Sequence, residues 1–192
     1  MNKNKLKVYI SLPFLLPHLL LRYRSRLSVV YGLDQTGTLL NRRNPYKNSV
    51  MQFVYFFVNL KEYRNVFYHR MGYKRFFIEW MFPCEKTCFI RTSPHKMGGG
   101  ISISHGHSLE INAKQIGKNL HVFQNVTIGS RNTPATPIIG DNVTIGAGAV
   151  VLGDIKIGNN VKIGANAVVV DDIPDNCTVV PDKSKVIKFV NK

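Results

Sequence analysis

Two histidines, His105 and His107, stand two residues apart just after three glycines at 98–100. An imidazole has an ordinary pKa of about 6.5, so it exchanges protons near neutral pH. Residues two apart in a strand face the same way, and we therefore expect both rings to line one cleft. Glu110 follows closely and is an acidic candidate for orienting an imidazole. These residue types suit general acid–base chemistry.

Metal binding is the alternative use of such residues. Three histidines can hold zinc tetrahedrally, and His105, His107 and His121 would form that set here. Cys84 and Cys88 would supply at most half of a metal site, because nothing at ligand spacing accompanies them. We interpret both thiols as buried or unused. The odd total of three cysteines indicates reduced thiols in a cytoplasmic setting.

A six-residue period dominates the chain after the glycines and must position these side chains. Aliphatic residues recur six apart without a slip, at Ile139, Ile145, Val151, Ile157, Ile163 and Val169. Glycine follows four of them directly. A second apolar series lies two residues before each next aliphatic, and an upstream set keeps the same step at Ile116, Val122 and Ile128.

A period of six fits neither a helix nor the two-residue alternation of a hairpin sheet. It is typical of a solenoid in which each hexapeptide makes one strand and one corner, with three hexapeptides to a triangular coil. The aliphatic residues then stack into an inward column, and Gly or Asn takes the backbone angles of the corners. The stretch SRNTPATPI at 130–138 interrupts the repeat. Its prolines predict a loop that projects from a corner.

The first half of the chain has a different character. Residues 1–97 carry 17 Lys and Arg against 4 acids, whereas residues 98–192 carry 9 against 7. Apolar residues within the aromatic-rich stretch 48–81 recur at steps of three and four, which predicts a helix buried on one face after a break at Asn44-Pro45. We expect a basic, mostly helical domain over 1–96, a β-helix over 97–180 and a tail over 181–192.

The basic half would attract an anion such as nucleic acid, acidic phospholipid or acidic polysaccharide, or it would remain a solvated face. We expect no nucleic-acid partner, because neither zinc-finger spacing nor an RNP-like aromatic pattern is present. The apolar run over 6–21 contains Pro13, Pro17 and His18, and is shorter than the ~20 residues of a spanning helix. The basic RYRSR that follows is unlike a signal cleavage site. We expect this run to pack against the protein, with peripheral contact to an anionic inner membrane as the alternative.

A resemblance to the hexapeptide-repeat acyltransferases rests on two stretches, GGGISISHGHSLEINAKQIGKNLHVFQNVTIGS and PIIGDNVTIGAGAVVLGDIKIGNNVKIGANAVVVDDIP. The sequence most resembles the serine acetyltransferase branch and its relatives in surface-polysaccharide gene clusters. The likeness covers about residues 97–180. It implies a left-handed parallel β-helix and a homotrimer. It also implies that acetyl-CoA lies along the cleft between neighbouring β-helices, with no metal.

The resemblance also implies roles for individual residues. It places His105 on the catalytic base that takes the proton of an attacking hydroxyl, with His107 and Glu110 as auxiliary candidates. Small residues on consecutive coils would bind the cofactor through their backbone, and a lysine would meet a CoA phosphate. These positions are Gly146, Ala147, Lys162, Gly164 and Ala165. A backbone N–H at a glycine-rich corner would stabilise the oxyanion.

Two departures from the serine acetyltransferases change the expected acceptor. Those enzymes carry an acid upstream of the catalytic histidine and a second histidine in the loop before the next repeat. This chain has FIRTSPHK and SRNTPATPI there, without either group. We therefore expect an acetyl-CoA-dependent O-acetyltransferase acting on a sugar hydroxyl of a surface polysaccharide or its precursor. The alternatives are L-serine O-acetylation, a zinc-dependent carbonic anhydrase, and a β-helix used only for assembly. The segment VPDKSK at 180–185 replaces the family's usual ending, which closes over the cofactor.

Overall fold

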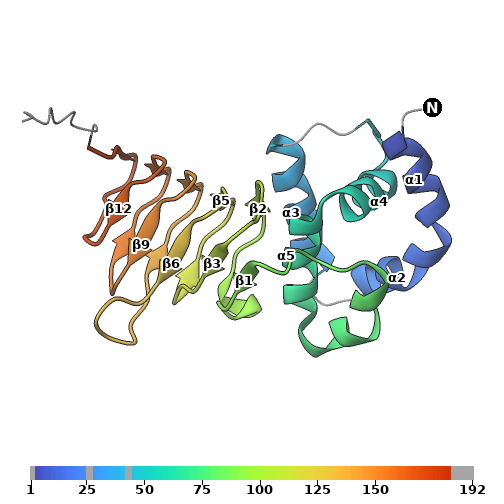
Figure 1. Ribbon diagram of the computed structural model, residues 1–192, viewed down its shortest axis with the longest axis horizontal. Helices are drawn as coiled ribbons and strands as arrows, with labels where there is room; N and C mark the ends of the chain where they lie inside the picture. The colour runs from blue at the N-terminus through green and yellow to red at the C-terminus, as the bar shows by residue number, and fades with distance from the viewer. Residues whose placement is uncertain (1–2, 25–27, 42–44, 183–192) are drawn as a thin grey trace, which may run out of the picture.

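The computed structural model describes residues 3–24, 28–41 and 45–182, and these form two parts of different architecture (Figure 1). Helices form the part on the right of the view, and a solenoid of short parallel strands forms the part on the left. The expected fold class is therefore confirmed: a mostly helical first half precedes a left-handed parallel β-helix. The helices are α1 (Lys3–Ser11), α2 (Leu16–Arg24), α3 (Ser28–Asn41), α4 (Ser49–Asn59) and α5 (Lys61–Met71), with 3-10 turns η1 (Pro13–Leu15), η2 (Gly72–Phe77), η3 (Glu79–Met81) and η4 (Pro94–Lys96).

The β-helix has three faces, each a parallel sheet. Face A contains β1 (Cys88–Ile90), β3 (Leu109–Ile111), β6 (Thr127–Gly129), β9 (Val150–Leu152) and β12 (Val168–Val169). Face B contains β4 (Gln115–Ile116), β7 (Ile138–Ile139) and β10 (Lys156–Ile157). Face C contains β2 (Ser102–Ile103), β5 (His121–Val122), β8 (Thr144–Ile145), β11 (Lys162–Ile163) and β13 (Thr178–Val179). In each coil the chain runs along face A, then face B, then face C, and the strands of each coil pair with those of the coils before and after it.

The inward column follows the six-residue period. The repeat aliphatics and the second apolar series are all buried in one cluster, apart from Ile173, which packs against it half-buried. The coils that follow the loop have a regular length of three hexapeptides, because Thr144 pairs with Lys162 and Val150 pairs with Val168. Burying this column removes apolar surface from water, which is the main favourable contribution to folding.

The proline-containing interruption is an insertion in one coil. Thr127 pairs with Val150, whereas Val150 pairs with Val168, so the coil that contains the interruption is longer than a regular coil by almost one hexapeptide. Residues 130–134 are exposed, as expected for a loop that projects from a corner. Ile128 and Ile139 lie on consecutive faces, A and B. The loop therefore lengthens a single hexapeptide.

The parallel ladder begins earlier than the glycine run suggested. Strand β1 pairs with β3 through Cys88 and Leu109, and it therefore precedes the boundary expected at residue 97. The repeat signal is weak there because Phe89 points outward and is half exposed, while Cys88 takes the inward position usually held by an aliphatic. Burial raises the pKa of the Cys88 thiol to about 12, so this thiol stays protonated and unreactive at neutral pH.

The aromatic stretch over 48–81 forms two helices and two 3-10 turns instead of the single predicted helix. Asn48 caps α4 by accepting hydrogen bonds from the backbone N–H groups of Val50 and Met51. Leu60 takes an extended conformation and separates α4 from α5, and Gly72 ends α5 at a φ of 59°. The chain turns at these two residues so that α4 and α5 fold back on each other around a core of aromatic rings. That core contains Phe53, Phe56, Phe57, Tyr63, Phe67 and Tyr68.

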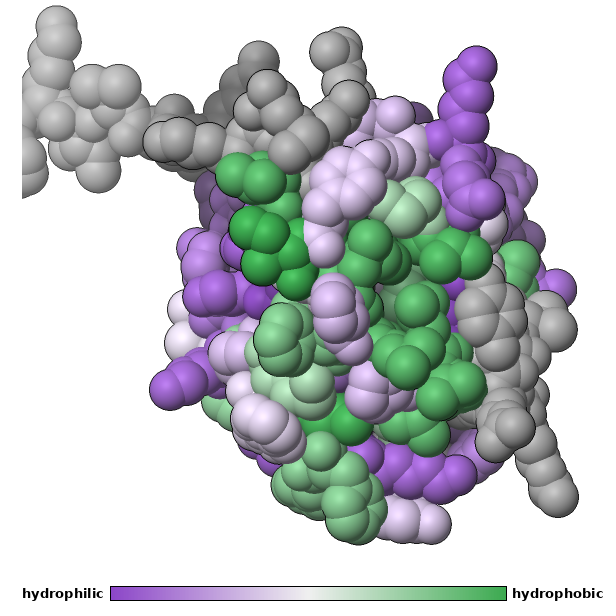
Figure 2. Space-filling model, turned by 90° about the vertical axis from the view of Figure 1, so that its right-hand side faces the viewer, coloured by the Kyte–Doolittle hydropathy of each residue, from purple (hydrophilic) through white to green (hydrophobic). Residues whose placement is uncertain are grey.

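The apolar run over 6–21 forms most of α1, all of η1 and most of α2, at the end of the molecule farthest from the β-helix (Figure 1). Burial against the protein, which we expected for the whole run, applies to one side only. Val8, Leu15 and His18 are buried, whereas Ile10 and Phe14 are 64% and 58% exposed. Figure 2 shows the resulting apolar surface. Within the described residues, no helix is both long and apolar enough to cross a membrane.

A buried ion pair joins the helices to the first coil. The carboxylate of Asp34 on α3 accepts hydrogen bonds from Arg70 Nη2 on α5 at 3.1 Å and from the backbone N–H of Ile101 at 2.9 Å. Arg70 also donates to the carbonyl oxygens of Met97 and Gly98, which lead into β2. Both charged side chains are almost fully buried. The helical domain is therefore fixed to the coil that carries His105.

His18 should make the protein less stable in acid. Burial lowers the pKa of this imidazole to about 4, and its Nε2 lies 3.1 Å from the hydroxyl of Tyr68. The unfolded chain binds a proton at His18 below about pH 6.5, but the native chain does so only near pH 4. The stabilisation is therefore complete above pH 6.5 and is lost as the pH falls towards 4. Over that window the free energy of unfolding should fall by roughly 3 kcal/mol more than in a His18→Gln variant.

Urea titrations at pH 7, 5 and 4 would measure this difference. His95→Gln serves as the matched control, because His95 is exposed and the variant keeps the buried imidazole of His18. Equal pH slopes in the native chain and in His18→Gln would contradict the assignment.

Candidate active site

The predicted base sits at a corner of the first complete coil. His105 to Ser108 connect β2 on face C with β3 on face A, and both histidine side chains are exposed. His105 and Ser108 have φ values of 55° and 49°, so the chain turns sharply from face C to face A within four residues. Gly106 is buried beneath them, and a Cβ there would meet the side chains of Glu62 and Ile103 at 3.1 and 3.2 Å. This tight packing against α5 turns both imidazoles outward.

This histidine corner is longer than the corner stacked on it. Ser102 on β2 pairs with His121 on β5, and Glu110 on β3 pairs with Thr127 on β6. The step from Ser102 to Glu110 is two positions longer than the matching step from His121 to Thr127, so the first coil accommodates two additional residues between β2 and β3. The repeat pattern alone did not reveal this insertion, because the aliphatic series begins after it. The insertion places His105 and His107 together at the edge between faces C and A.

The predicted cofactor positions stack on the same edge. The backbone N–H of Asn125 donates to His107 O, that of Gly148 to Gln124 O, and that of Asn166 to Ala147 O. These hydrogen bonds join four consecutive corners, which contain His105–Ser108, Gln124–Asn125, Ala147–Gly148 and Ala165–Asn166. Coils in a parallel ladder lie about 4.8 Å apart, so the edge extends in steps of that length from the histidine corner to Ala165.

Small residues keep this edge open above the histidines. Gly146 lies against the next coil so closely that a Cβ would come within 2.6 Å of the backbone nitrogen of Ala165. Ala147 is half-buried and Ala165 is exposed, so the edge presents methyl groups and backbone there. Lys162 lies beside the edge, exposed on the outside of face C between Thr144 and Thr178. The structure therefore brings four of the predicted cofactor residues onto one edge and places Lys162 on the adjacent face.

Two acids near the corner have different partners. Glu110, which we considered as an orienting group, pairs with Arg91 Nε on the outside of face A. Glu85, which the sequence analysis did not select, places Oε2 3.8 Å from His107 Nδ1 and 4.0 Å from Lys61 Nζ. Although partial burial raises the pKa of Glu85, its hydrogen bonds with Thr87 and the charges of His107 and Lys61 bring the net pKa below its usual value. Glu85 and His107 are separated in the sequence by the whole of strands β1 and β2, so nothing in the local pattern could reveal the contact.

His121 lies in strand β5 on face C. Its ring packs beside Phe123 at 4.6 Å, and its Nε2 lies 3.0 Å from Ser104 Oγ. Ser104 is the buried residue that immediately precedes His105. The repeat assigns Val122 correctly to the interior, and the residue before it therefore lies outward on the strand.

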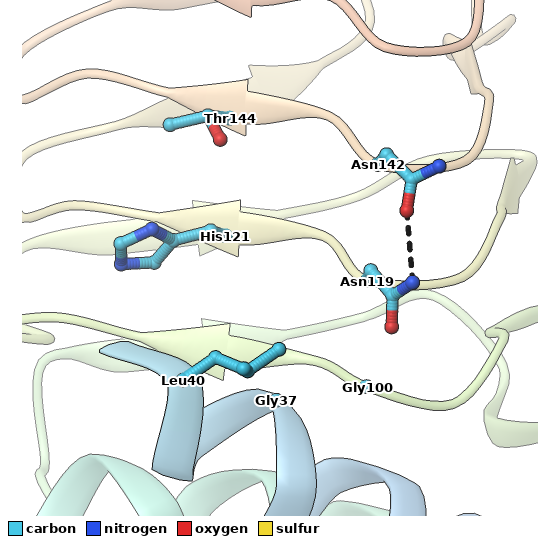
Figure 3. Close-up of a pocket in the computed structure, with 7 residues that line it drawn as sticks. All are labelled: Gly37, Leu40, Gly100, Asn119, His121, Asn142 and Thr144. Carbon is cyan, nitrogen blue, oxygen red and sulfur yellow. Dashed lines mark hydrogen bonds between the residues drawn. The ribbon is translucent and has the colours of Figure 1, made fainter. Parts of the chain in front are cut away.

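A small hollow lies beside His121 where α3 approaches face C (Figure 3). Its volume is about 190 Å³, and Leu40 from α3 faces His121 and Thr144 across it. Asn119 and Asn142 form its far side, joined by a hydrogen bond of 2.8 Å. The hollow thus offers imidazole, hydroxyl and amide groups on the same face as the serine that precedes His105.

Gln124 is a further residue that the sequence analysis missed. It occupies the corner between the histidines and Ala147, and its side-chain oxygen is buried without a hydrogen-bond partner among the described residues. Buried polar atoms nearly always have a partner, so this oxygen is a candidate acceptor for a donor from a bound ligand. Among the same residues, no group of three or more histidines, cysteines or acids could hold a metal ion.

These coils follow the six-residue repeat that the sequence predicts, and the comparisons with known proteins concern this repeat. Residues 136–171 match the bacterial transferase hexapeptide (six repeats) family. The chain is 42% identical over 93 residues to the putative colanic acid biosynthesis acetyltransferase WcaB of Escherichia coli, covering 47% of this chain and 57% of that protein. It is 43% identical over 96 residues to the serine acetyltransferase of Synechococcus elongatus, covering 48% of this chain and 39% of that protein. The chain thus spans about half the length of these curated relatives.

Solved structures extend the likeness into the helices. The serine acetyltransferase isoform 3 of Entamoeba histolytica, in complex with cysteine, has a TM-score of 0.62 at 26% identity over 83% of this chain and 60% of that chain. The Neisseria gonorrhoeae serine acetyltransferase, in complex with serine, has a TM-score of 0.63 at 25% identity over 86% of this chain and 71% of that chain. The resemblance to hexapeptide-repeat acyltransferases is confirmed.

Proposed function

We propose that this chain is an acetyl-CoA-dependent O-acetyltransferase with His105 as its general base. The observation that carries the proposal is the shared edge, on which the histidine corner stacks below Ala147 and Ala165. A thioester bound along that edge would bring its acyl carbon towards the histidines. The relatives that match this half of the chain carry acetyltransferase names, which supports the same chemistry.

His105, a backbone N–H of the corner and Gln124 each have one role in the proposed reaction. His105 takes the proton of the acceptor hydroxyl as its oxygen attacks the acetyl carbonyl, forming the new C–O bond. A backbone N–H at the corner stabilises the oxyanion. The C–S bond then breaks, and the proton held by His105 passes to the departing thiolate. Gln124 accepts a hydrogen bond from an amide N–H of the pantetheine arm, which satisfies its buried oxygen.

We propose a sugar hydroxyl of a surface polysaccharide or its precursor as the acceptor. FIRTSPHK and SRNTPATPI lack the acid and the second histidine that suit serine acetyltransferases to their amino acid. The likeness to a protein named for colanic acid biosynthesis supports a glycan. The hollow beside His121 offers groups that hydrogen-bond to hydroxyls. L-Serine remains the second candidate, because proteins named serine acetyltransferases match this chain both in sequence and over most of its fold.

Thiol release measures the function and the acceptor together. Purified protein with acetyl-CoA should release CoA when sugars or nucleotide sugars are added, and more slowly with L-serine. Turnover with L-serine alone would overturn the glycan assignment but keep the acetyltransferase. Failure to bind acetyl-CoA in a calorimetric titration would overturn the enzyme itself and favour a β-helix used for assembly.

We also propose a homotrimer, in which a neighbouring β-helix completes the cleft along the exposed edge. An exposed apolar side chain supports this assembly. In β12, Val169 points into the core, whereas Val168 lies on the outside of face A and is 67% exposed. The tail over 181–192, which replaces the family's usual ending, lies outside the described residues from position 183 onward. Sedimentation equilibrium of the full chain at micromolar concentration measures the assembly.

Filling the edge at Ala165 should weaken acetyl-CoA binding. Ala165→Trp places a large ring on the exposed corner two coils above Gln124, where the pantetheine arm needs to approach the backbone. We expect the KM for acetyl-CoA to rise roughly tenfold or more, which is a loss of about 1.4 kcal/mol in binding. The thermal midpoint should stay unchanged because the site is exposed. Lys156→Trp, on an exposed position of face B, is the matched control. Equal KM values for the two variants would contradict this cofactor path.

A further inference from the structure

The end of the molecule opposite the β-helix carries a surface that the proposed acetyl transfer does not use. We define the end face as the exposed apolar side chains of α1, η1, α2, η2 and η3. It contains Leu6, Tyr9, Ile10, Phe14, Leu16, Leu20, Tyr73, Phe76, Phe77 and Trp80. Figure 2 looks onto the α1–α2 end of the molecule and shows apolar atoms gathered at its centre with polar atoms around them. Ile10 and Phe14 lie beside Trp80, and exposed apolar side chains gathered in this way mark an interaction site.

We propose that the end face docks on the surface of an anionic lipid bilayer. This inference goes beyond acetyl transfer and does not depend on it. The first argument is the type of side chain. Tyr9, Tyr73 and Trp80 are amphipathic rings, which favour the boundary between water and hydrocarbon, and Trp80 is 76% exposed. The aliphatic side chains between them would enter the acyl region.

The second argument is charge. Residues 3–24 contain no acid at all, and η2 and η3 contain one, Glu79, which pairs with Arg75 at 3.4 Å. Lys7 on α1 and Lys74 on η2 are exposed and have no ion pair among the described residues. Each basic residue near an anionic leaflet contributes attraction, whereas a zwitterionic surface offers little. The charge of the face therefore complements an anionic bilayer.

The third argument is a hollow within the face. It has a volume of about 400 Å³ and lies between η1 and η3, lined by Ile10, Ser11, Phe14, Trp80, Met81 and Phe82. All but one of these side chains are apolar, so the hollow suits a hydrocarbon segment. An apolar depression of this size would accept an acyl chain from the leaflet that the end face contacts.

A second copy of the chain is a poorer occupant of this face. A two-fold contact would place the same basic surface against itself, because an isologous interface brings identical patches together. Lys7 and Lys74 would then face like charges, because α1 and α2 contain no acid and Glu79 is already paired with Arg75. The charge pattern thus favours the bilayer.

Trp80 makes the proposal directly testable, because it is the one tryptophan in the chain. Full-length protein is mixed with vesicles of phosphatidylcholine alone or with added phosphatidylglycerol. With anionic vesicles, we expect the emission of Trp80 to shift to the blue and to be quenched by lipids brominated on their acyl chains. Flotation with the vesicles gives the partition constant. An unchanged spectrum with anionic vesicles would overturn the proposal. A blue shift that appears without lipid as the protein concentration rises would also overturn it, in favour of a second copy.

Paired variants separate the apolar and the charged contributions. Ile10→Ser with Phe14→Ser should lower the partition constant at least tenfold, because each side chain loses its transfer into the apolar layer. Phe89→Ser with Val180→Ser is the matched control, exposed to a similar degree on the β-helix, and should bind as the native chain does. Lys7→Glu with Lys74→Glu should weaken binding to anionic vesicles by about fivefold or more per lysine and leave the weak binding to phosphatidylcholine unchanged. Equal binding by all three pairs would contradict a role for this face.

Discussion

Replacing His105 by alanine should lower kcat by about 10²–10⁴-fold while acetyl-CoA binding stays close to native, because the variant lacks the base that takes the acceptor proton. Since His105 is exposed at a corner, its removal leaves the packed interior intact. Thiol release under acceptor saturation measures the first effect, and calorimetric titration with acetyl-CoA measures the second.

Two further variants make this result specific. His95→Ala removes an exposed histidine on η4 and should leave kcat unchanged. His107→Ala should cost far less than His105→Ala, because His107 is the auxiliary residue in the proposed reaction. The opposite order would transfer the role of base to His107. In that case Glu85→Gln should reproduce the loss, because Glu85 is the acid within 3.8 Å of that ring.

Replacing Asp34 by alanine should lower the free energy of unfolding by about 3–5 kcal/mol, because the change leaves the buried Arg70 guanidinium without its counter-charge. The backbone N–H of Ile101 would also lose its acceptor. A loss of this size is a large part of the stability of an ordinary domain. Urea unfolding followed by far-ultraviolet circular dichroism measures it.

A double variant distinguishes a broken pair from a general packing defect. Asp34→Leu with Arg70→Met removes both charges and should be more stable than Asp34→Ala alone, because no buried charge remains unpaired. Asp154→Ala, on an exposed acid of the β-helix, should change stability by no more than about 0.5 kcal/mol. A double variant as unstable as the sum of its single changes would contradict the ion-pair explanation.

The Asp34 pair also connects stability with the site. The Asp34 carboxylate fixes Ile101 by accepting a hydrogen bond from its backbone N–H, and His105 lies four residues further along the chain. The pair holds Arg70 of α5 in place, and the histidine corner packs against α5 at Gly106. Breaking the Asp34–Arg70 pair should therefore lower turnover even at temperatures where the variant is still folded. The helical domain thus positions the corner that carries the proposed base.

The sequence by itself determined the β-helix, its inward column and the projecting loop. The same hexapeptide pattern recurs in each coil, so the structure of one coil can be extended to the next. Ala147 and Ala165 occupy equivalent positions in consecutive coils for this reason. The helical first half was also predictable in kind. Its breaks at Leu60 and Gly72 were not, because they depend on how α4 and α5 pack around the aromatic core.

Only the tertiary structure decided which polar groups meet. The proximity of Glu85 to His107, the contact between Ser104 and His121, and the pairing of Glu110 with Arg91 all join residues that are distant in the sequence and adjacent in space. The longer corner at His105 is likewise visible only from the pairing of β2 and β3 with the next coil. Repeats specify what recurs along the chain, whereas hydrogen bonds and charges depend on distances in space. The apolar run at the start of the chain shows the same limit, because its composition predicted burial and its packing left one side of it exposed.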